Sequence, residues 1–403
     1  MEKKANLYLK ISANKSRGIF LMRNFNKLTL LLLCFFLCLN VFAQAESDFV
    51  INDNGIITNY TGQETEIVIP SRIKGIPVTE IGLSAFRNKK LTSVIIPNGI
   101  TVISFSAFEN NFLTSVVIPE GVTAINGSAF TKNKLTSIII PQSVTHIGRN
   151  SFSYNELTSV ILPDNITSIG ERTFLENKLT SVTIPNSVTS IEREAFYENQ
   201  LTSVIISNNI TEINERVFGI NKLTSVIIPN GVTIIHRGAF TSNELVSVII
   251  PEGVTSIGIH AFSNNQLKSV VIPDSVITIE DNAFANNLLT SVTIPSSVRN
   301  IKTEAFARNE LKKLIIVNGL VNIGDSVFAE NKLTYVILPP SVNYVGGDAF
   351  QFNPITRIKI GANVTVGRLH FTAFANFDHF YNTNDKKAGT YVRRNGRWTM
   401  LLD

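Results

Sequence analysis

The sequence holds few of the side chains that usually carry covalent chemistry or bind metals. Its 403 residues include 2 cysteines, 5 histidines and 1 tryptophan. Both cysteines, Cys34 and Cys38, lie in an apolar run near the N-terminus that we expect to be removed on export. The remaining chain then has no thiol with which to form a disulfide or to ligate a metal. Its stability must come from packing alone.

Recognisable catalytic motifs are also missing. The sequence contains no phosphate-binding G-x-x-x-x-G-K-[ST], no nucleophile motif G-x-S-x-G and no zinc-binding H-E-x-x-H. His146, His236 and His260 fall at different phases of the repeat described below, so they cannot share one surface column as metal ligands. We therefore expect a protein that is not an enzyme and that uses no cofactor or metal.

Two groups of polar residues near the C-terminus have the composition of binding sites. One could ligate zinc and comprises His370, Asp378 and His379. The other could contact acidic polymers and comprises Arg393, Arg394, Arg397 and Trp398. For the first group we favour polar side chains that face solvent on a helix over 371–381. A solvated hairpin that turns at Asn395-Gly396 is favoured for the second.

The positive charge of the chain is confined to its N-terminus. The formal net charge is +5, from 36 basic and 31 acidic residues. Residues 1–45 hold seven of the basic residues and one of the acidic ones, which leaves 29 basic against 30 acidic residues in the rest. Nucleic-acid binders usually need a basic stripe to neutralise phosphates, and residues 91–353 contain no such run. Nucleic acid is not an expected partner.

Residues 22–45 have the pattern of a secretory signal peptide. A short basic start precedes the apolar segment 28–39, and small residues follow it. We expect cleavage near Ala43 or Ala45, and Met22 is an alternative start of translation. The mature protein is expected at the cell surface or outside the cell, with the periplasm as an alternative. An uncleaved anchor and a lipid-modified cysteine are competing interpretations of the same segment.

One 22-residue repeat dominates the rest of the sequence. Its pattern, L-T-S-V-I-I-P-N-G-V-T-x-I-x-x-x-A-F-x-x-N-x, has thirteen starts from Leu91 to Ile355 without an insertion or deletion. Phenylalanine recurs in one phase from Phe86 to Phe350. This register predicts a solenoid in which equivalent side chains of successive coils share one interior. A single unit is not expected to fold alone.

Each unit is predicted to form a three-sided coil. Residues 91–96 alternate with period two and favour a strand that pairs in parallel with the next coil. Residues 100–103 resemble a second short strand, and the segment ending at Phe108 is expected to be a turn or a brief helix. The asparagine of each unit, such as Asn111, is expected to bond turn backbone rather than a ligand. Six apolar side chains of the first unit would face the interior: Leu91, Val94, Ile96, Ile100, Ile103 and Phe108.

The sequence predicts one array with two ends. Five extra residues near 73–77 distinguish the first repeat, and the last is stretched by two residues between Ile355 and Phe374. Hairpins are predicted around Asn54-Gly55 and Asn395-Gly396. The expected parts are a leader and signal peptide at 1–45, an N-terminal cap with the first atypical repeat at 46–90, twelve repeats at 91–354, a last degenerate repeat at 355–376 and a capping hairpin at 377–403.

The repeat resembles the BspA-like leucine-rich repeat of bacterial surface proteins. The resemblance rests on the proline, V-T-x-I and A-F elements at the family's spacing and covers about residues 48–403. It implies a repeat solenoid: a stack of parallel β-sheets with short strands and short helix or turn segments in a single curved or twisted array. It also implies export and attachment to other proteins or cells, including host matrix components. This chain has asparagine where many repeats of the family carry cysteine.

One surface of the predicted array is apolar along its whole length. If Val94 and Ile96 point inward, Ile95 between them points outward. The equivalent residues form an outer row that would run about 55–60 Å at about 4.8 Å per strand. Long apolar rows usually mark interaction surfaces, but β-branched residues also stabilise a strand ladder, and both interpretations stand. Thr183 and Thr293 occupy two positions of the row; the other ten form a candidate partner-binding stripe: Ile95, Val117, Ile139, Ile161, Ile205, Ile227, Ile249, Val271, Ile315 and Ile337.

These features predict a secreted or cell-surface, non-catalytic scaffold for adhesion or protein–protein interaction through an exposed β-sheet. The expected partner is a protein, such as a host matrix protein or another surface protein. A glycan-binding or cell-envelope-binding structural protein is the alternative. Sugar sites usually need clustered aromatic side chains, and tyrosine and tryptophan are sparse outside the two ends of the array.

Overall fold

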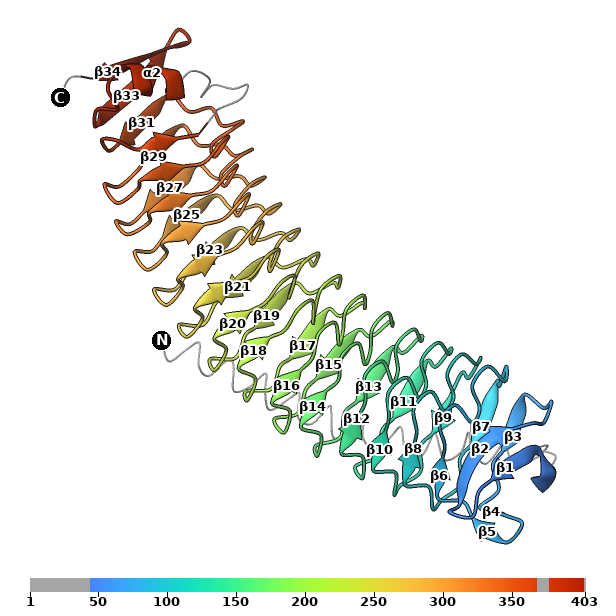
Figure 1. Cartoon of the computed structure of the whole chain (residues 1–403). Coiled ribbons are helices and arrows are strands. Elements are labelled where there is room, and N and C mark those ends of the chain that lie inside the picture. Colours follow the sequence, from blue (N-terminus) through green and yellow to red (C-terminus); the bar gives the residue numbers. More distant parts are fainter. Residues whose placement is uncertain (1–43, 368–376, 402–403) are drawn as a thin grey trace, which may run out of the picture.

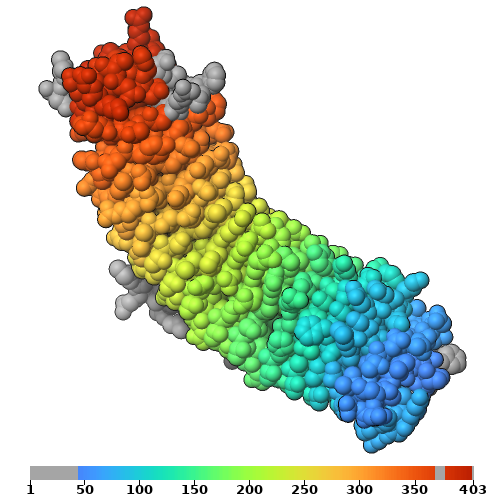
Figure 2. Space-filling model, viewed as in Figure 1, coloured from blue at the N-terminus to red at the C-terminus, as the bar shows by residue number. Residues whose placement is uncertain are grey.

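The chain forms a long, bent rod of stacked coils (Figure 1, Figure 2). The computed structural model describes residues 44–367 and 377–401. Each coil winds once around a shared interior and lies against the coil before it and the coil after it, so the strands pair with partners one repeat away. The predicted parallel repeat solenoid is confirmed.

Each coil contributes two short strands, and these build two strand columns along the rod (Figure 1). The first column consists of β3 (Glu66–Val68), β7 (Ser93–Ile95), β9 (Val116–Val117), β11 (Ser137–Ile139), β13 (Ser159–Ile161), β15 (Ser181–Thr183), β17 (Ser203–Ile205), β19 (Ser225–Ile227), β21 (Ser247–Ile249), β23 (Ser269–Val271), β25 (Ser291–Ile294), β27 (Lys313–Ile316), β29 (Tyr335–Ile337) and β31 (Arg357–Ile360). The second column consists of β6 (Glu80–Ile81), β8 (Val102–Ile103), β10 (Ala124–Ile125), β12 (His146–Ile147), β14 (Ser168–Ile169), β16 (Ser190–Ile191), β18 (Glu212–Ile213), β20 (Ile234–Ile235), β22 (Ser256–Ile257), β24 (Thr278–Ile279), β26 (Asn300–Ile301), β28 (Asn322–Ile323), β30 (Tyr344–Val345) and β32 (Thr365–Val366).

The period-two alternation of each first strand decides which side chains enter the interior. In β7 the Val94 side chain is buried and the Ile95 side chain is exposed, and Ile96 directly after the strand is buried again. Val94 pairs with Val116 and Ile95 with Val117, each one repeat later. The proline that follows the strand in most coils has no N–H with which to extend the ladder. The strands therefore stay short.

A column of phenylalanine rings fills the interior on the third side of the coil. The rings from Phe86 to Phe350 stack face to face, with neighbouring centroids between 5.0 and 5.9 Å apart. Phe130, Phe152 and Phe174 are fully buried in the same environment. One uninterrupted apolar interior therefore runs through the array.

The third side of each coil is a turn and not a helix. In the first repeat, Ser106 and Asn110 adopt left-handed backbone conformations with φ of 55° and 56°. The N–H groups of Ser106, Phe108 and Asn110 donate to carbonyl oxygens of the next coil at 3.0, 2.8 and 3.0 Å. Because these bonds run between coils, the turn side forms a hydrogen-bond ladder of its own. The turn alternative for this segment is confirmed.

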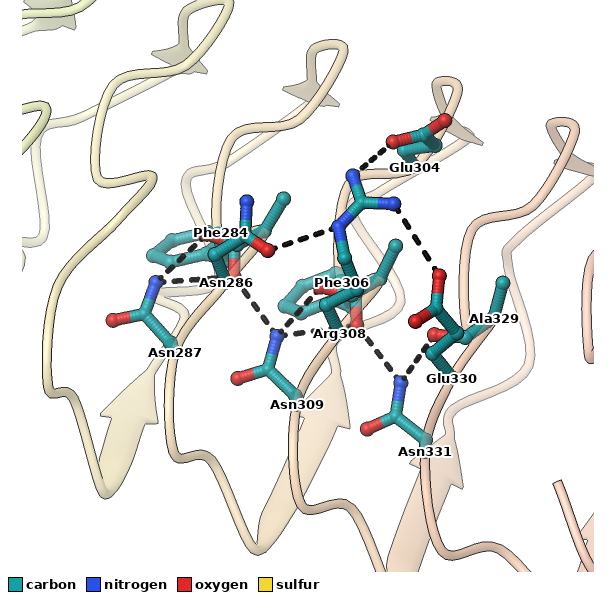
Figure 3. A network of polar contacts seen from close by, with 12 residues as sticks. Phe284, Asn286, Asn287, Glu304, Phe306, Arg308, Asn309, Ala329, Glu330 and Asn331 are labelled. Carbon is teal, nitrogen blue, oxygen red and sulfur yellow. Dashed lines mark hydrogen bonds and ion pairs between the residues drawn. The ribbon is translucent and has the colours of Figure 1, made fainter. Parts of the chain in front are cut away.

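The constant spacing of asparagine from Asn111 to Asn353 places one amide inside each of these turns, where it joins adjacent coils. Asn309 donates through Nδ2 to the carbonyl oxygens of Phe284, one coil back, and Phe306, in its own coil, at 2.9 and 3.2 Å. Its Oδ1 accepts the N–H of Leu289 at 3.1 Å. Figure 3 shows this arrangement repeated at Asn287, Asn309 and Asn331. The side chains are buried, so their role is structural, as expected.

The N-terminal end departs from the repeat. A short 3₁₀ turn, η1 (Glu46–Asp48), leads into an antiparallel hairpin of β1 (Phe49–Ile51) and β2 (Ile56–Tyr60), and β2 pairs in parallel with β6. The five additional residues form a second hairpin, β4 (Arg72–Ile73) with β5 (Ile76–Pro77). Phe49 and Tyr60 pack on Phe86 and end the ring column.

The C-terminal end is covered by a helix and a hairpin. β33 (Gly389–Arg394) pairs antiparallel with β31 and with β34 (Arg397–Leu401), and α2 (Phe377–Thr383) packs its Phe377 ring on Tyr391 and Trp398 at 5.5 and 5.0 Å. The helix expected over 371–381 begins at Phe377 among the described residues and extends two residues further; residues 371–376 lie outside them.

The last coil differs from the expected length in its first part. Tyr344 of β30 pairs with Thr365 of β32, 21 positions later instead of 22, so one residue is lost before β32. The predicted lengthening by two residues is counted over the whole coil to Phe374 and stays a prediction. The remainder up to Phe374 lies outside the described residues.

Replacing Asn243 with alanine should lower the free energy of unfolding by about 2–4 kcal/mol, because buried polar groups lose their partners. These groups are the N–H of Leu223 at 3.0 Å and the carbonyl oxygens of Phe218 and Phe240 at 2.9 and 3.2 Å. Urea denaturation followed by circular dichroism measures the change. Asn230→Ala, at an exposed asparagine of the same coil, should change stability by less than about 0.5 kcal/mol. Equal midpoints for both variants would contradict the role of the asparagine.

Candidate interaction surface

The outer row lies on the first strand column and is continuous from coil to coil. Ladder partners place Ile139 beside Val117 and Ile161, and Ile249 beside Ile227 and Val271. All ten stripe residues chosen from the sequence are exposed large hydrophobic side chains, and Thr183 and Thr293 between them are exposed as well. The structure therefore brings these residues together on one face.

Exposure along the outer row is uneven. Seven of the ten stripe residues expose between 40% and 49% of their surface. Ile227, Ile249 and Val271 instead expose 80%, 82% and 77%. These three residues lie on β19, β21 and β23, which form a separate three-stranded sheet. We refer to Ile227, Ile249 and Val271 as the exposed trio.

A pocket adjoins the C-terminal end of the exposed trio. It has a volume of about 580 Å³ and lies between β23 and β25, where the ladder of the first column is interrupted. Val271 of the trio, Thr293 of the outer row and Val317 form apolar parts of its wall, and Asp274 contributes a carboxylate. Sequence reasoning missed this pocket, although Val317 in its wall stands where most coils have proline.

The second strand column presents a different surface. Most of its outward positions are polar, such as Ser168, Glu212, Ser256 and Asn300, but Val102, Ala124 and Ile234 are aliphatic and half-buried. His146 and Tyr344 are also outward and exposed. Both strand columns need β-forming residues, yet only the first carries a row that is apolar except at Thr183 and Thr293. A predominantly apolar row is therefore found on one face.

The turn side of the rod is charged. Glu194 is buried between two arginines of neighbouring coils: Arg172 Nε lies 2.6 Å from Oε2, and Arg216 Nη1 lies 3.2 Å from Oε1. Arg193 pairs with Glu171 at 2.8 Å. Burial by itself would raise the pKa of Glu194, but the hydrogen bonds and charges of these arginines outweigh it and hold the pKa below its ordinary value of 4.5. These groups are already paired with each other.

A second charged network lies further along the same side (Figure 3). Arg308 donates to Glu304 of its own coil and to Asn286 Oδ1 at 2.9 Å, and its Nη1 lies 3.5 Å from Glu330 Oε1. Each contact except that with Glu304 joins adjacent coils. These ion pairs and hydrogen bonds align the coils.

The histidines lie apart on the described part of the chain. His146 is exposed on β12, His236 Nε2 lies 2.8 Å from Glu212 Oε2, and burial lowers the pKa of His260. Asp378 and His379 belong to α2, and His370 lies outside the described residues. Over residues 44–367 and 377–401, no three His, Cys, Asp or Glu side chains gather as metal ligands would.

The basic and aromatic residues near the C-terminus, predicted as a possible contact for acidic polymers, do not all lie on the surface. Arg394 and Arg397 flank the exposed Asn395-Gly396 turn of the β33–β34 hairpin, while Trp398 is buried against Phe377. Since the tryptophan ring faces the cap interior, it is not available to stack on a ligand together with the arginines.

Comparison with known proteins identifies the repeat. The model of the family described as BspA type leucine-rich repeat region matches residues 79–199, 145–268 and 255–380, which together span well over half of the chain. No curated protein matches the sequence.

Solved structures of bacterial leucine-rich repeat proteins resemble this one. A leucine-rich repeat protein from Bacteroides ovatus has 22% identity and a TM-score of 0.56, covering 81% of this chain and 88% of its own. A leucine-rich cell surface protein from Faecalibacterium prausnitzii has 26% identity and a TM-score of 0.48, covering 86% and 98%. The pneumococcal vaccine antigen PcpA has 20% identity and a TM-score of 0.49, covering 76% and 93%. The first likeness supports the fold.

Among residues 44–367 and 377–401, no helix combines the length and the apolar character needed to cross a bilayer.

Replacing Glu194 with glutamine should lower stability at pH 7 by about 1–2 kcal/mol, because charged hydrogen bonds to Arg172 and Arg216 are lost. The pKa of Glu194 is lower in the folded than in the unfolded chain, so its contribution is present above pH 4.5 and is lost as pH falls through the folded value. The difference between wild type and Glu194→Gln should therefore shrink below pH 4.5. Urea midpoints measured from pH 7 to pH 3 test this.

Glu120 serves as the matched control for this titration, since it is an exposed glutamate on the same array. Glu120→Gln should leave the midpoint at pH 7 within about 0.5 kcal/mol of wild type. A Glu194→Gln difference that stays constant across the acid range would show that the carboxylate contributes through packing rather than charge.

Proposed function

We propose that this chain, which belongs to the family of BspA-type leucine-rich repeat proteins, is an exported, non-catalytic scaffold that binds a protein partner through its outer row. The observation that carries the proposal is the contiguous apolar face of the first strand column, with its maximum exposure at the exposed trio. Contiguous exposed apolar surfaces of this length usually mark sites of protein interaction.

Strand stabilisation alone accounts poorly for the exposed trio. A β-branched side chain stabilises a ladder by packing on its same-face neighbours, and that gain grows with the area it buries. Ile227 and Ile249 leave 80% and 82% of their surface uncovered, so the area buried by such packing is small. Isoleucine at these positions contributes little to the isolated fold, whereas a partner would cover it.

The chemistry of this segment indicates the kind of partner it fits. Exposed Ser225, Ser247 and Ser269 accompany the trio, and the pocket beside Val271 has a carboxylate, Asp274, in its wall. An apolar side chain inserted in the pocket, next to a donor that reaches Asp274, would satisfy both parts of this surface. We therefore infer a protein surface with an aliphatic or aromatic anchor. Proteins of an extracellular matrix or of another cell surface are the class that an exported scaffold would meet.

A double charge substitution tests the proposal. Ile227→Glu combined with Ile249→Glu places two carboxylates on the trio and should weaken binding to immobilised matrix proteins by at least about tenfold in Kd. The fold should be retained because both side chains are exposed. Surface plasmon resonance against collagen, fibronectin and laminin gives the affinity, and circular dichroism verifies the fold.

The matched control places the same charges on the other sheet of neighbouring coils. Ser256→Glu with Thr278→Glu, at outward positions of the second strand column, should bind like wild type. Equal binding by the Ile227/Ile249 variant would rule out the outer row as the site. Binding of wild type to a glycan array but to none of the matrix proteins would favour the glycan-binding alternative.

A further inference from the structure

The first strand of the array, β3, has its outer edge covered by a single side chain. β3 pairs with β7 on one side and stands at the end of its sheet. On its other side, Gln44 Nε2 donates to the carbonyl oxygen of Glu66 at 2.9 Å. Gln44 Oε1 accepts the N–H of Val68 at 2.8 Å. One carboxamide therefore satisfies both backbone groups along this edge.

These are the two bonds that a further strand would make. In a parallel ladder, a residue of the adjacent strand donates to one carbonyl and accepts from the N–H two positions later on the same edge. Glu66 and Val68 are two positions apart, so the carboxamide of Gln44 replaces a peptide group of an absent strand. Uncovered edge strands offer free N–H and C=O groups that pair with other chains. Gln44 closes this edge.

Ala45 and Glu46, which follow Gln44, make further hydrogen bonds that hold this N-terminal segment in place. The carbonyl oxygen of Ala45 accepts the N–H of Asp48 at 2.9 Å and thereby closes η1. The carboxylate of Glu46 accepts the N–H of Lys74 at 2.7 Å, in the turn of the β4–β5 hairpin. Residues 44–46 are thus part of the N-terminal cap and not a tail that leads into it.

The two cleavage positions in the leader give products that differ in this cap. A small residue precedes each position, so the sequence permits cleavage after Ala43 or after Ala45. Cleavage after Ala45 would remove the carboxamide from the edge of β3 and the carbonyl group from η1. Cleavage after Ala43 leaves all of these bonds in place.

We infer that the mature protein begins at Gln44, through hydrolysis of the peptide bond between Ala43 and Gln44. This inference rests on the proposed export, because a protease that removes signal peptides performs the step. Water adds to the carbonyl carbon of Ala43 and the C–N bond breaks. The leader leaves with a carboxylate on Ala43, and the mature chain keeps a free amine on Gln44. The new terminal residue then closes the sheet edge with its own side chain.

The N-terminal residue of the exported protein tests the cleavage position. The protein is collected from the medium and the surface of producing cells, and its N-terminal peptide is identified by mass spectrometry. The expected start is Gln44 as glutamine, because the cyclic form has lost the amide nitrogen that donates to the Glu66 carbonyl oxygen. An exported chain that starts at Glu46 overturns this inference and leaves export standing. If the chain keeps its leader and stays inside intact cells, where added protease does not reach it, both this inference and the proposed export are overturned.

The capping role is tested separately on chains released from a cleavable N-terminal fusion. Hydrogen exchange of the Val68 amide should be roughly fivefold to tenfold faster in chain 46–403 and in Gln44→Ala than in chain 44–403. Gln63→Ala, at an exposed glutamine near β3, should exchange like chain 44–403. Equal protection of Val68 in all four chains would show that Gln44 does not cap the edge.

Discussion

The constant distance between equivalent residues is the constraint on which the structure depends. Because successive coils are 22 residues apart, each phenylalanine ring lies on the next one at 5.0 to 5.9 Å, and each strand residue meets its counterpart. The asparagine bridges require the same spacing, since each amide bonds backbone groups of two coils. One inserted residue would misalign these contacts between the two coils that it separates, and the spacing is constant from Leu91 to Ile355.

A stack held by neighbour contacts must end somewhere, and the departures from the period occur at the ends. Glu66 pairs with Ser93, five positions more than the period, and Tyr344 pairs with Thr365, one position fewer. Antiparallel hairpins lie beyond both places, because a strand that reverses direction needs no further coil to pair with. The sheet edges at the two ends of the array are thus covered by hairpins that lie outside the repeat.

The three sides of the rod differ in the side chains that they present. The turn side pairs its charges between coils, as at Glu194 and Arg308, and so contributes to stacking. The second strand column presents mainly polar residues. Only the first column carries an apolar row, and its exposure peaks where the sheet is interrupted on both sides of β19, β21 and β23. The exposure of this row therefore differs between coils that share one repeat pattern.

The sequence by itself determined the fold of this protein, because thirteen copies repeat each weak signal in phase. The Phe column, the outward position of Ile95 and the structural role of Asn111 all follow from that phase. Tertiary structure alone decided the left-handed turn residues, such as Ile220 with φ of 49°, since bonds between coils impose a conformation that isoleucine disfavours. It also decided the exposed trio, the pocket and the edge contact of Gln44. These depend on how particular coils meet, and a pattern that is the same in every coil cannot encode such differences.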